Sequence, residues 1–387
     1  MKTFFNAVTF MAGITIALGS FAAEWTIDVE GTPEFGYNDN VTLRENKEDS
    51  FTFKIKPTLV LGRAVDDMTS SVQLGYALER YSSISRLDSE NPFILFRNNY
   101  STERANFGLN ASFVEDSTRN EAEDDNGDFA SSATSRTRSI SPSISYQVTE
   151  IDSIQSNFTY SEKEYSSPDF DDNQTKSLTL GWTRQFTERF IAGVNTTVSN
   201  YKIDGLTSSS DDDNYNLATF LSYQLTETWS ISGDIGFRRL ETERKFNTGN
   251  VLKDTNSGSS FSISSAYAQE KDDIDVKYYK ELSPSSSGNV NEQEGISLNW
   301  SRELTELITA NLRASYKETR TASSQLDDEK RENINLSPSL TWKLDSNLGL
   351  NIGYVFKQQK RDEMRDVESN SVMVSVTYDW DGYRISR

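Results

Sequence analysis

The stretch Tyr146-Gln147-Val148-Thr149-Glu150 decides the fold, because variants of it return along the chain. Each variant places Thr-Glu between two runs in which apolar and polar residues alternate, a pattern typical of a tight turn between strands. The other pairs are Thr102-Glu103, Thr187-Glu188, Thr226-Glu227 and Thr305-Glu306. Their spacing of roughly 40 residues, or a small multiple of it, is the scale of repeated supersecondary units. The sequence therefore predicts a chain of β-hairpins.

Period-two alternation predicts about eighteen strands, many of them long enough for a tilted membrane crossing of roughly 9–11 residues. The rising strands begin near Trp25, Met68, Ala105, Asp152, Arg189, Thr228, Asp272, Leu307 and Asn347, and the returning strands end near Arg63, Thr102, Val148, Phe186, Leu225, Glu270, Leu304, Leu344 and Trp380. Short turns alternate with long polar connections, which we place at residues 119–134, 204–213 and 243–257. Short periplasmic turns and long extracellular loops are typical of bacterial outer-membrane barrels. The predicted fold is all-β, a transmembrane antiparallel up-and-down β-barrel with both termini in the periplasm.

The two faces of the predicted strands differ as a lipid-facing and a water-facing side should. Ile296, Leu298 and Trp300, for example, alternate with Ser297 and Asn299. Aromatic residues also gather shortly before the turns, where they form a membrane girdle or simply follow the preference of aromatics for strands. These residues are Trp182, Phe186, Tyr223, Trp229, Trp300, Trp342 and Trp380. Their repeated position favours the girdle.

Four prolines fall inside the strand patterns, at Pro33, Pro57, Pro142 and Pro338. Proline cannot donate to a sheet ladder, so it is normally confined to edges, strand starts and bulges. A closed barrel has no edge. We therefore expect a bulge or a bend at each of these positions.

The first residues of the chain have the parts of a secretory signal peptide. Lys2 supplies the positive charge, residues 4–18 form an apolar stretch, and Ser20-Phe21-Ala22 supplies a cleavage pattern of small residues. An uncleaved anchor is the alternative, although the apolar stretch is short for a membrane span. We predict a signal peptide at residues 1–22 and a single barrel domain at residues 23–387.

The composition excludes several classes of protein. The chain has no Cys and no His, so it cannot hold disulfides, thiolate metal sites or the commonest catalytic bases. A metal site would need carboxylates alone. The formal net charge of −20 argues against a nucleic-acid partner. We therefore predict no enzyme activity, no cofactor and no metal.

The negative charge is concentrated in four polar segments, at residues 121–128, 169–172, 211–213 and 327–329. The simpler interpretation of each is a solvated acidic loop. The alternative is that bound divalent cations bridge the carboxylates to the anionic sugars and phosphates of an outer leaflet. We expect residues 121–128 to be accessible to proteases from outside the cell. The Thr-Glu turns likewise have two interpretations, a row of carboxylates that binds a periplasmic partner, or ordinary turn chemistry.

The segment Tyr37-Asn38-Asp39-Asn40-Val41, followed by residues 53–61, resembles the start of the β-barrel porin 2 family. That family includes outer-membrane proteins associated with exopolysaccharide systems. The resemblance implies a barrel in the outer membrane of a Gram-negative bacterium, without catalytic residues, whose better-understood relatives pass exported polysaccharide. It would also lead one to expect a C-terminal aromatic residue. The chain instead continues from Trp380 to Arg387, so the assembly signal is internal or the last strand extends further.

A barrel of this size encloses a water-filled passage rather than a packed core. The polar face is rich in hydroxyls and amides and has mixed charge. The candidate lumen-lining residues are Glu34, Lys54, Lys56, Glu79, Asp234, Arg238, Asp275, Lys277, Arg313, Lys317 and Lys357. Any one of these charges can equally be a hydrated or paired residue of the wall.

Three functions fit this wall. The lead hypothesis is a passive conduit for exported exopolysaccharide, with polysaccharide and periplasmic export components as partners. The alternatives are a general or substrate-selective diffusion porin, and a plugged barrel with an adhesive or surface-structural role. All three require contact with outer-membrane lipid and lipopolysaccharide.

Overall fold

The computed structural model describes residues 23–322, 330–362, 365–380 and 382–386. The predicted signal peptide and the acidic segment at residues 327–329 lie outside these ranges. Within them, no helix is long and apolar enough to cross a membrane.

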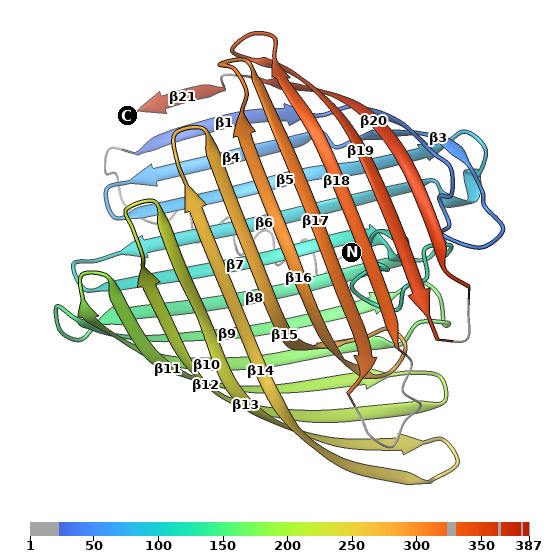
Figure 1. Ribbon diagram of the computed structural model, residues 1–387. Coiled ribbons are helices and arrows are strands. Elements are labelled where there is room, and N and C mark those ends of the chain that lie inside the picture. The colour runs from blue at the N-terminus through green and yellow to red at the C-terminus, as the bar shows by residue number, and fades with distance from the viewer. Residues whose placement is uncertain (1–22, 323–329, 363–364, 381, 387) are drawn as a thin grey trace.

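The described chain is a single antiparallel sheet that closes on itself (Figure 1). The strands are β1 Glu24–Gly31, β2 Glu34–Asn38, β3 Ser50–Ile55, β4 Thr58–Val65, β5 Met68–Tyr81, β6 Ser89–Ser101, β7 Ala105–Ser117, β8 Thr134–Gln147, β9 Asp152–Tyr165, β10 Asp172–Thr187, β11 Phe190–Asp204, β12 Ser208–Gln224, β13 Trp229–Phe246, β14 Val251–Ala268, β15 Asp272–Pro284, β16 Val290–Glu303, β17 Ile308–Thr321, β18 Arg331–Lys343, β19 Leu348–Arg361, β20 Val367–Asp379 and β21 Tyr383–Ser386. Two short helices, η1 Ser85–Leu87 and α2 Thr118–Glu121, lie in connections. The ring closes where β20 pairs with β1 and β2.

The ring formed by the described residues contains eighteen strands, as the alternation predicts. Two of them are interrupted, because β1 with β2, and β3 with β4, each form one strand across a proline. The short β21 continues the last strand, since both β20 and β21 pair with β1. The last strand thus extends beyond Trp380, one of the two outcomes that we expected.

We expect a bulge or a bend at each proline, and the ladders show no bulge, because the prolines break hydrogen bonding without shifting the register. Across Pro33, the partners of β20 continue in sequence, from Glu30 opposite Asp379 to Glu34 opposite Ser375. At Pro142 and Pro338, two pairs are lost from the ladder on one side only, and the ladder on the other side is kept. The neighbouring strand therefore holds the register that the missing donor would otherwise loosen.

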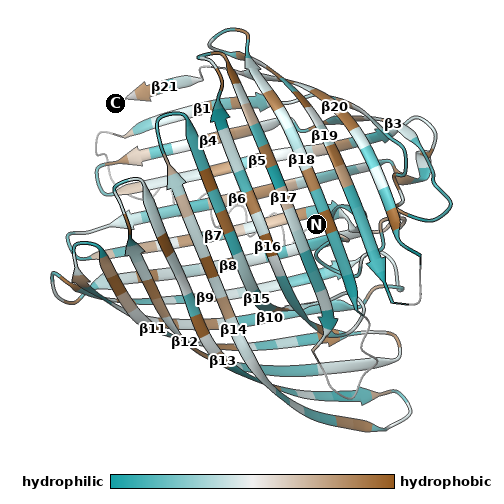
Figure 2. Ribbon diagram, viewed as in Figure 1, coloured by the Kyte–Doolittle hydropathy of each residue, from teal (hydrophilic) through white to brown (hydrophobic). Residues whose placement is uncertain are grey.

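Apolar residues face outward and polar residues face inward along most strands. Figure 2 shows the resulting patches of apolar and polar residues along the ribbons. On β13, Ile235 is 63% exposed while Arg238 is buried. Six of the seven predicted girdle aromatics are exposed, and Trp300 is half-buried. Because a soluble fold would bury these apolar side chains, the exposed band is the surface that lipid covers.

The connections lie alternately at two ends of the barrel. The turn end has the short Thr-Glu turns, and the loop end has the longer connections, among them residues 39–49, 82–88, 118–133, 166–171 and 285–289. Two predicted long loops are wrong, because β12, β13 and β14 continue through most of residues 204–213 and 243–257. Both faces of a strand that extends beyond the membrane meet water, so its sequence loses the alternation that marks a strand.

A second aromatic belt encircles the loop end, and the sequence pattern did not reveal it. Outward-facing tyrosines there form hydrogen bonds with polar side chains near the loop end, in most cases as donors. The pairs are Tyr37–Asp49, Tyr76–Glu90, Tyr160–Gln174, Tyr278–Glu294, Tyr316–Glu318 and Tyr354–Asn370, although in the Tyr160 pair the Gln174 amide is the donor. Amphipathic rings of this kind lie at the membrane–water interface. The two belts therefore mark the positions of the two membrane surfaces along the barrel axis.

Candidate functional site: a loop that crosses the lumen

Residues 118–133, which connect β7 to β8, fold into the barrel instead of projecting outward. We call this segment the crossing loop. It begins with α2, whose Arg119 is only 5% exposed, and it buries Ala122 and Phe129. Glu121 to Asp128, which we expected to be a solvated acidic segment open to proteases, is therefore held inside the barrel. The reason is that cations of the wall contact its carboxylates.

The near end of the crossing loop is fixed to β5. Arg119 Nη2 donates hydrogen bonds to Glu79 Oε2 and to Tyr81 Oη, both at 2.8 Å. Tyr81 Oη in turn donates to Glu79 Oε2 at 3.0 Å. Lys54 Nζ lies 3.4 Å from the other oxygen of Glu79. A buried carboxylate with this many partners is a rigid anchor.

The middle of the crossing loop, at Asp124 and Asp125, is fixed to the part of the wall that lies opposite β8. Lys317 on β17 forms an ion pair with Asp124, and Gln293 on β16 donates to the Asp124 carbonyl at 2.7 Å. Arg331 on β18 donates to the Asp125 carbonyl at 2.6 Å. In an eighteen-strand ring, β17 stands halfway round from β8, where the crossing loop ends. The crossing loop therefore spans the lumen.

Side contacts complete the attachment. Lys163 Nζ lies 2.8 Å from Glu121 Oε2, and Lys357 Nζ lies 3.6 Å from Glu123 Oε2. The loop at residues 285–289 also folds inward, where the Ser285 hydroxyl donates to Asp125 Oδ1 at 2.8 Å. The acidic side chains are thus used in contacts with the wall. Among the described residues, no cluster of three or more acidic side chains is placed to hold a metal ion.

The predicted lumen-lining residues fall into two groups. Glu79, Lys317 and Lys357 contact the crossing loop directly, and Lys54 does so through Glu79. Glu34 stands opposite Lys54 in the ladder between β2 and β3. These five residues come together around the crossing loop.

The other six predicted residues lie apart from the crossing loop. Arg238 is buried against Glu292, Asp234 lies near Lys277, and Lys277 lies 5.2 Å from the Tyr279 ring. Lys56 Nζ lies 4.5 Å from the centre of the Phe93 ring. Asp275 and Arg313 both pair with Asn299 in the ladders on either side of β16. Asp234, Arg238, Lys277 and Lys56 thus each have a local charged or aromatic partner.

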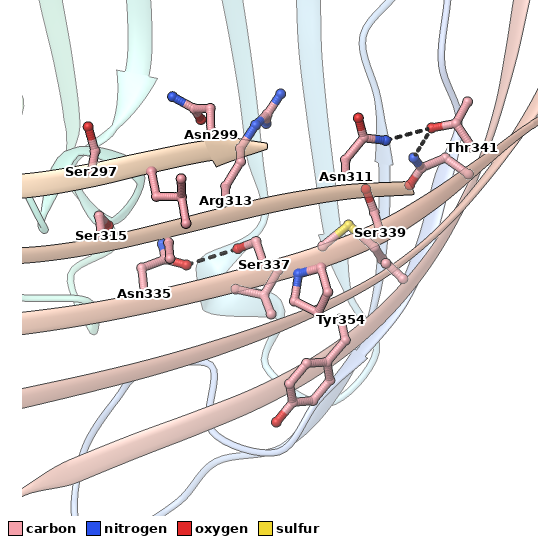
Figure 3. A pocket seen from close by; sticks show the side chains of 17 residues that line it. Ser297, Asn299, Asn311, Arg313, Ser315, Asn335, Ser337, Ser339, Thr341 and Tyr354 are labelled. Atoms are coloured by element: carbon pink, nitrogen blue, oxygen red, sulfur yellow. Dashed lines mark hydrogen bonds between the residues drawn. The ribbon is translucent and has the colours of Figure 1, made fainter. Parts of the chain in front are cut away.

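A cavity of about 660 Å³ lies against the polar face of β16 to β19, and we call it the wall cavity. Figure 3 shows Ser297, Asn299, Asn311 and Arg313 on one side of the strands, with Tyr354 pointing away from them. The Asn311 and Asn351 amides both donate to the Thr341 hydroxyl, at 3.4 and 3.0 Å. The polar side chains of the lining are neutral hydrogen-bonding groups around a single guanidinium, and apolar residues such as Leu298 and Met373 complete the surface.

The sequence did not reveal the crossing loop, although it contained a signal. Basic residues concentrate at the loop-end tips of strands, at Lys163, Lys317, Arg331, Lys357 and Arg361. Apolar residues, Ala122 and Phe129 among them, interrupt the acidic connection between β7 and β8. An acidic segment with apolar residues, inside a ring of cations, is expected to fold inward.

Comparisons with known proteins agree on the architecture. The sequence profile of the autotransporter β-domain matches residues 153–270, less than half of the chain. The unliganded crystal structure of the ferric citrate transporter FecA superposes with a TM-score of 0.52 at 10% identity, over 88% of this chain and 60% of FecA. At that identity the likeness shows the fold alone. The protein is an outer-membrane β-barrel.

Two Pseudomonas aeruginosa structures are also similar to this chain. OpdO superposes with a TM-score of 0.49 at 11% identity, over 92% of this chain and 98% of OpdO. OccK2 (OpdF), in complex with glucuronate, superposes with a TM-score of 0.49 at 12% identity, over 94% of this chain and 98% of OccK2. No curated protein matches the sequence.

Proposed function

We propose that this outer-membrane barrel is a diffusion channel for small hydrophilic solutes, and that the crossing loop sets their size limit. The observation that carries the proposal is the attachment of this loop to two separate parts of the wall, at Glu79 on β5 and at Lys317 on β17, six strands apart in the ring. A segment fixed at both ends narrows a wide lumen without needing to move.

The chemistry of the wall supports a preference for neutral polar solutes. The wall cavity is lined mainly by Ser, Thr and Asn side chains, which can exchange hydrogen bonds with water or with a solute hydroxyl. Around the crossing loop, cations and carboxylates are paired, so their fields largely cancel. We expect weak ion selectivity and no tight binding site.

Export of a polysaccharide is the second candidate. A wall of hydroxyls and amides also suits a hydrated sugar chain, and the resemblance of the segment around Asp39 to exopolysaccharide-associated barrels points the same way. The fixed crossing loop leaves less room for a polymer than for a small solute. Deletion of the gene distinguishes the two, because a conduit is required for secretion of the polymer and a diffusion channel is not.

The direct test is conductance of the purified barrel in a planar bilayer. We expect steady single-channel current from the native protein. Replacement of residues 120–130 by a short Gly-Ser linker should raise that current, because it removes the segment that spans the lumen. A matched variant with the β13–β14 turn, residues 247–250, replaced in the same way should leave it unchanged. Equal currents in all three proteins would refute a constriction at the crossing loop, and absence of current in all three would refute the channel.

A further inference from the structure

Three cavities of the described chain form a series from the loop end inward. The outer cavity, of about 470 Å³, is lined by exposed residues such as Arg44 and Arg365. The middle cavity, of about 250 Å³, lies between the crossing loop and β2, β3 and β20. The wall cavity follows it towards the turn end.

Neighbouring cavities in this series share lining residues. Val355 and Met373 line both the wall cavity and the middle cavity. Leu43 and Phe129 line both the middle cavity and the outer cavity. The three cavities therefore adjoin one another in order, and each shared pair lies between one cavity and the next.

The junction of the outer and middle cavities is apolar and closely packed. Leu43 is 6% exposed and Phe129 is 7% exposed, and both pack with Ala122 and Val367. The residues come from three segments: the first loop (residues 39–49), the crossing loop and the start of β20. The charged side chains of the outer and middle cavities lie on either side of this apolar contact.

The backbone of Leu43 has a conformation that leucine rarely adopts. Leu43 has a φ of +46°, in the left-handed region that residues other than glycine rarely adopt. Asn40 supports this conformation, because its side-chain amide donates to the carbonyls of Arg44 and Glu368, each at 2.9 Å. Strain that the surroundings maintain in this way clusters at switch and ligand sites.

Phe129 is held in place by Lys357 on β19. Lys357 Nζ lies 5.2 Å from the centre of the Phe129 ring, and the same lysine forms an ion pair with Glu123 of the crossing loop. The wall thus fixes both the loop and its aromatic side chain. Leu43 and Phe129 meet because two loops, each attached to β19 or β20, are brought together.

We propose that Leu43 and Phe129 form a hydrophobic gate in a solute route that passes along β2, β3, β19 and β20. This inference rests on the proposed channel function and adds its path and its narrowest point. An apolar constriction of this kind limits passage because it holds little water. Below it, Lys54, Arg119 and Lys357 are each paired with a carboxylate, so the route suits uncharged polar solutes such as small sugars.

The test compares single-channel conductance and sugar uptake by liposomes for the native barrel, Phe129→Ala and Leu43→Gly. Glycine at position 43 keeps the left-handed backbone and removes the side chain. Each variant should raise conductance at least about twofold, since removal of either side chain lets water fill the junction. Leu206→Ala is the matched control, because Leu206 is an exposed apolar residue at the same end of the barrel.

The outcomes separate the gate from the channel. Native conductance with no change in Phe129→Ala and Leu43→Gly would overturn the gate and leave the channel standing. Absence of current from the native barrel and from every variant, including the crossing-loop replacement, would overturn both the gate and the channel. Because the chain has no native Cys, Phe129→Cys offers a second measurement on folded protein. A bulky charged thiol reagent should block its current, and unchanged current after complete labelling would place the route elsewhere.

Discussion

At the scale of single residues, the alternation of side chains along each strand decides what each position does. Ile235 and Phe237 face outward on β13, whereas the neighbouring Asp234 and Arg238 have charged partners. This much could be predicted from the sequence, because the side-chain period of a strand is two. Whether a given inward charge contacts a loop could not be predicted, because its partner lies far away in the chain.

A charge on the outer face should be costly and a charge on the inner face should not. We expect Ile235→Arg to reduce the free energy of unfolding by about 2–4 kcal/mol, since the position lies far from both aromatic belts. Ser232→Arg, on the polar face of the same strand, is the control and should cost much less. Denaturant unfolding of both variants in detergent or lipid vesicles measures the difference. Equal costs would contradict the assignment of faces.

Asp39 should make the attachment of the first loop depend on pH. The backbone N–H of Asn370 donates to Asp39 Oδ1 at 2.6 Å, and Lys47 Nζ lies 3.5 Å from Oδ2. Partial burial raises the pKa of Asp39, but the hydrogen bonds from Asn370 and the charge of Lys47 outweigh it and leave the pKa below its usual value. A lowered folded pKa gives stability that is present above the ordinary value of about 3.9 and is lost as pH falls through the folded value.

Replacement of Asp39 by Asn keeps the shape and removes this charge. At pH 7, Asp39→Asn should make local opening of residues 39–49 easier by about 1 kcal/mol. At a pH well below the lowered pKa of Asp39, the variant and the native protein should become alike, because the native carboxyl is then neutral. Hydrogen exchange of these residues, followed by mass spectrometry at both pH values, measures the effect. A difference that persists at low pH would show that charge is not its cause.

At the scale of elements, the strands could be predicted from local sequence, but the inward fold of the crossing loop could not. The number of strands followed from local alternation, and the extended hairpins of β12 to β14 were missed because strands above the membrane lose that alternation. The inward fold of the crossing loop depends on contacts such as that between Asp124 and Lys317, which are 193 residues apart. Nothing local distinguishes this acidic loop from a solvated one. The cations that bind it lie on other strands.

Charge reversal on the wall should release the crossing loop. Lys317→Glu places a carboxylate opposite Asp124 and should expose Glu121 and Glu123 to an endoprotease that cuts after glutamate. The native protein should resist cleavage there in intact cells. Adding Asp124→Lys to Lys317→Glu restores an opposite pair and should restore resistance. Cleavage of the native loop at the rate of the single variant would mean that the ion pair does not hold it.

At the scale of the whole molecule, an eighteen-strand ring is too wide for its side chains to fill, so the loops determine how open it is. The closed ring, the two aromatic belts and the polar inner face make a stable wall. The crossing loop and the first loop then narrow the lumen from the loop end. Function at this scale depends on how firmly the crossing loop is attached to the wall opposite its origin.

Cysteine cross-linking tests that attachment most directly, because the chain has no native cysteine. Asp124→Cys combined with Lys317→Cys should be joined by a short bifunctional thiol reagent that replaces the length of the lysine side chain, and mass spectrometry of the digested protein should detect the cross-link. Asp124→Cys combined with Thr179→Cys, on β10, should remain unlinked. A cross-link in the first pair alone is the result we predict. Two unlinked pairs in a correctly folded barrel would show that the loop does not cross the lumen.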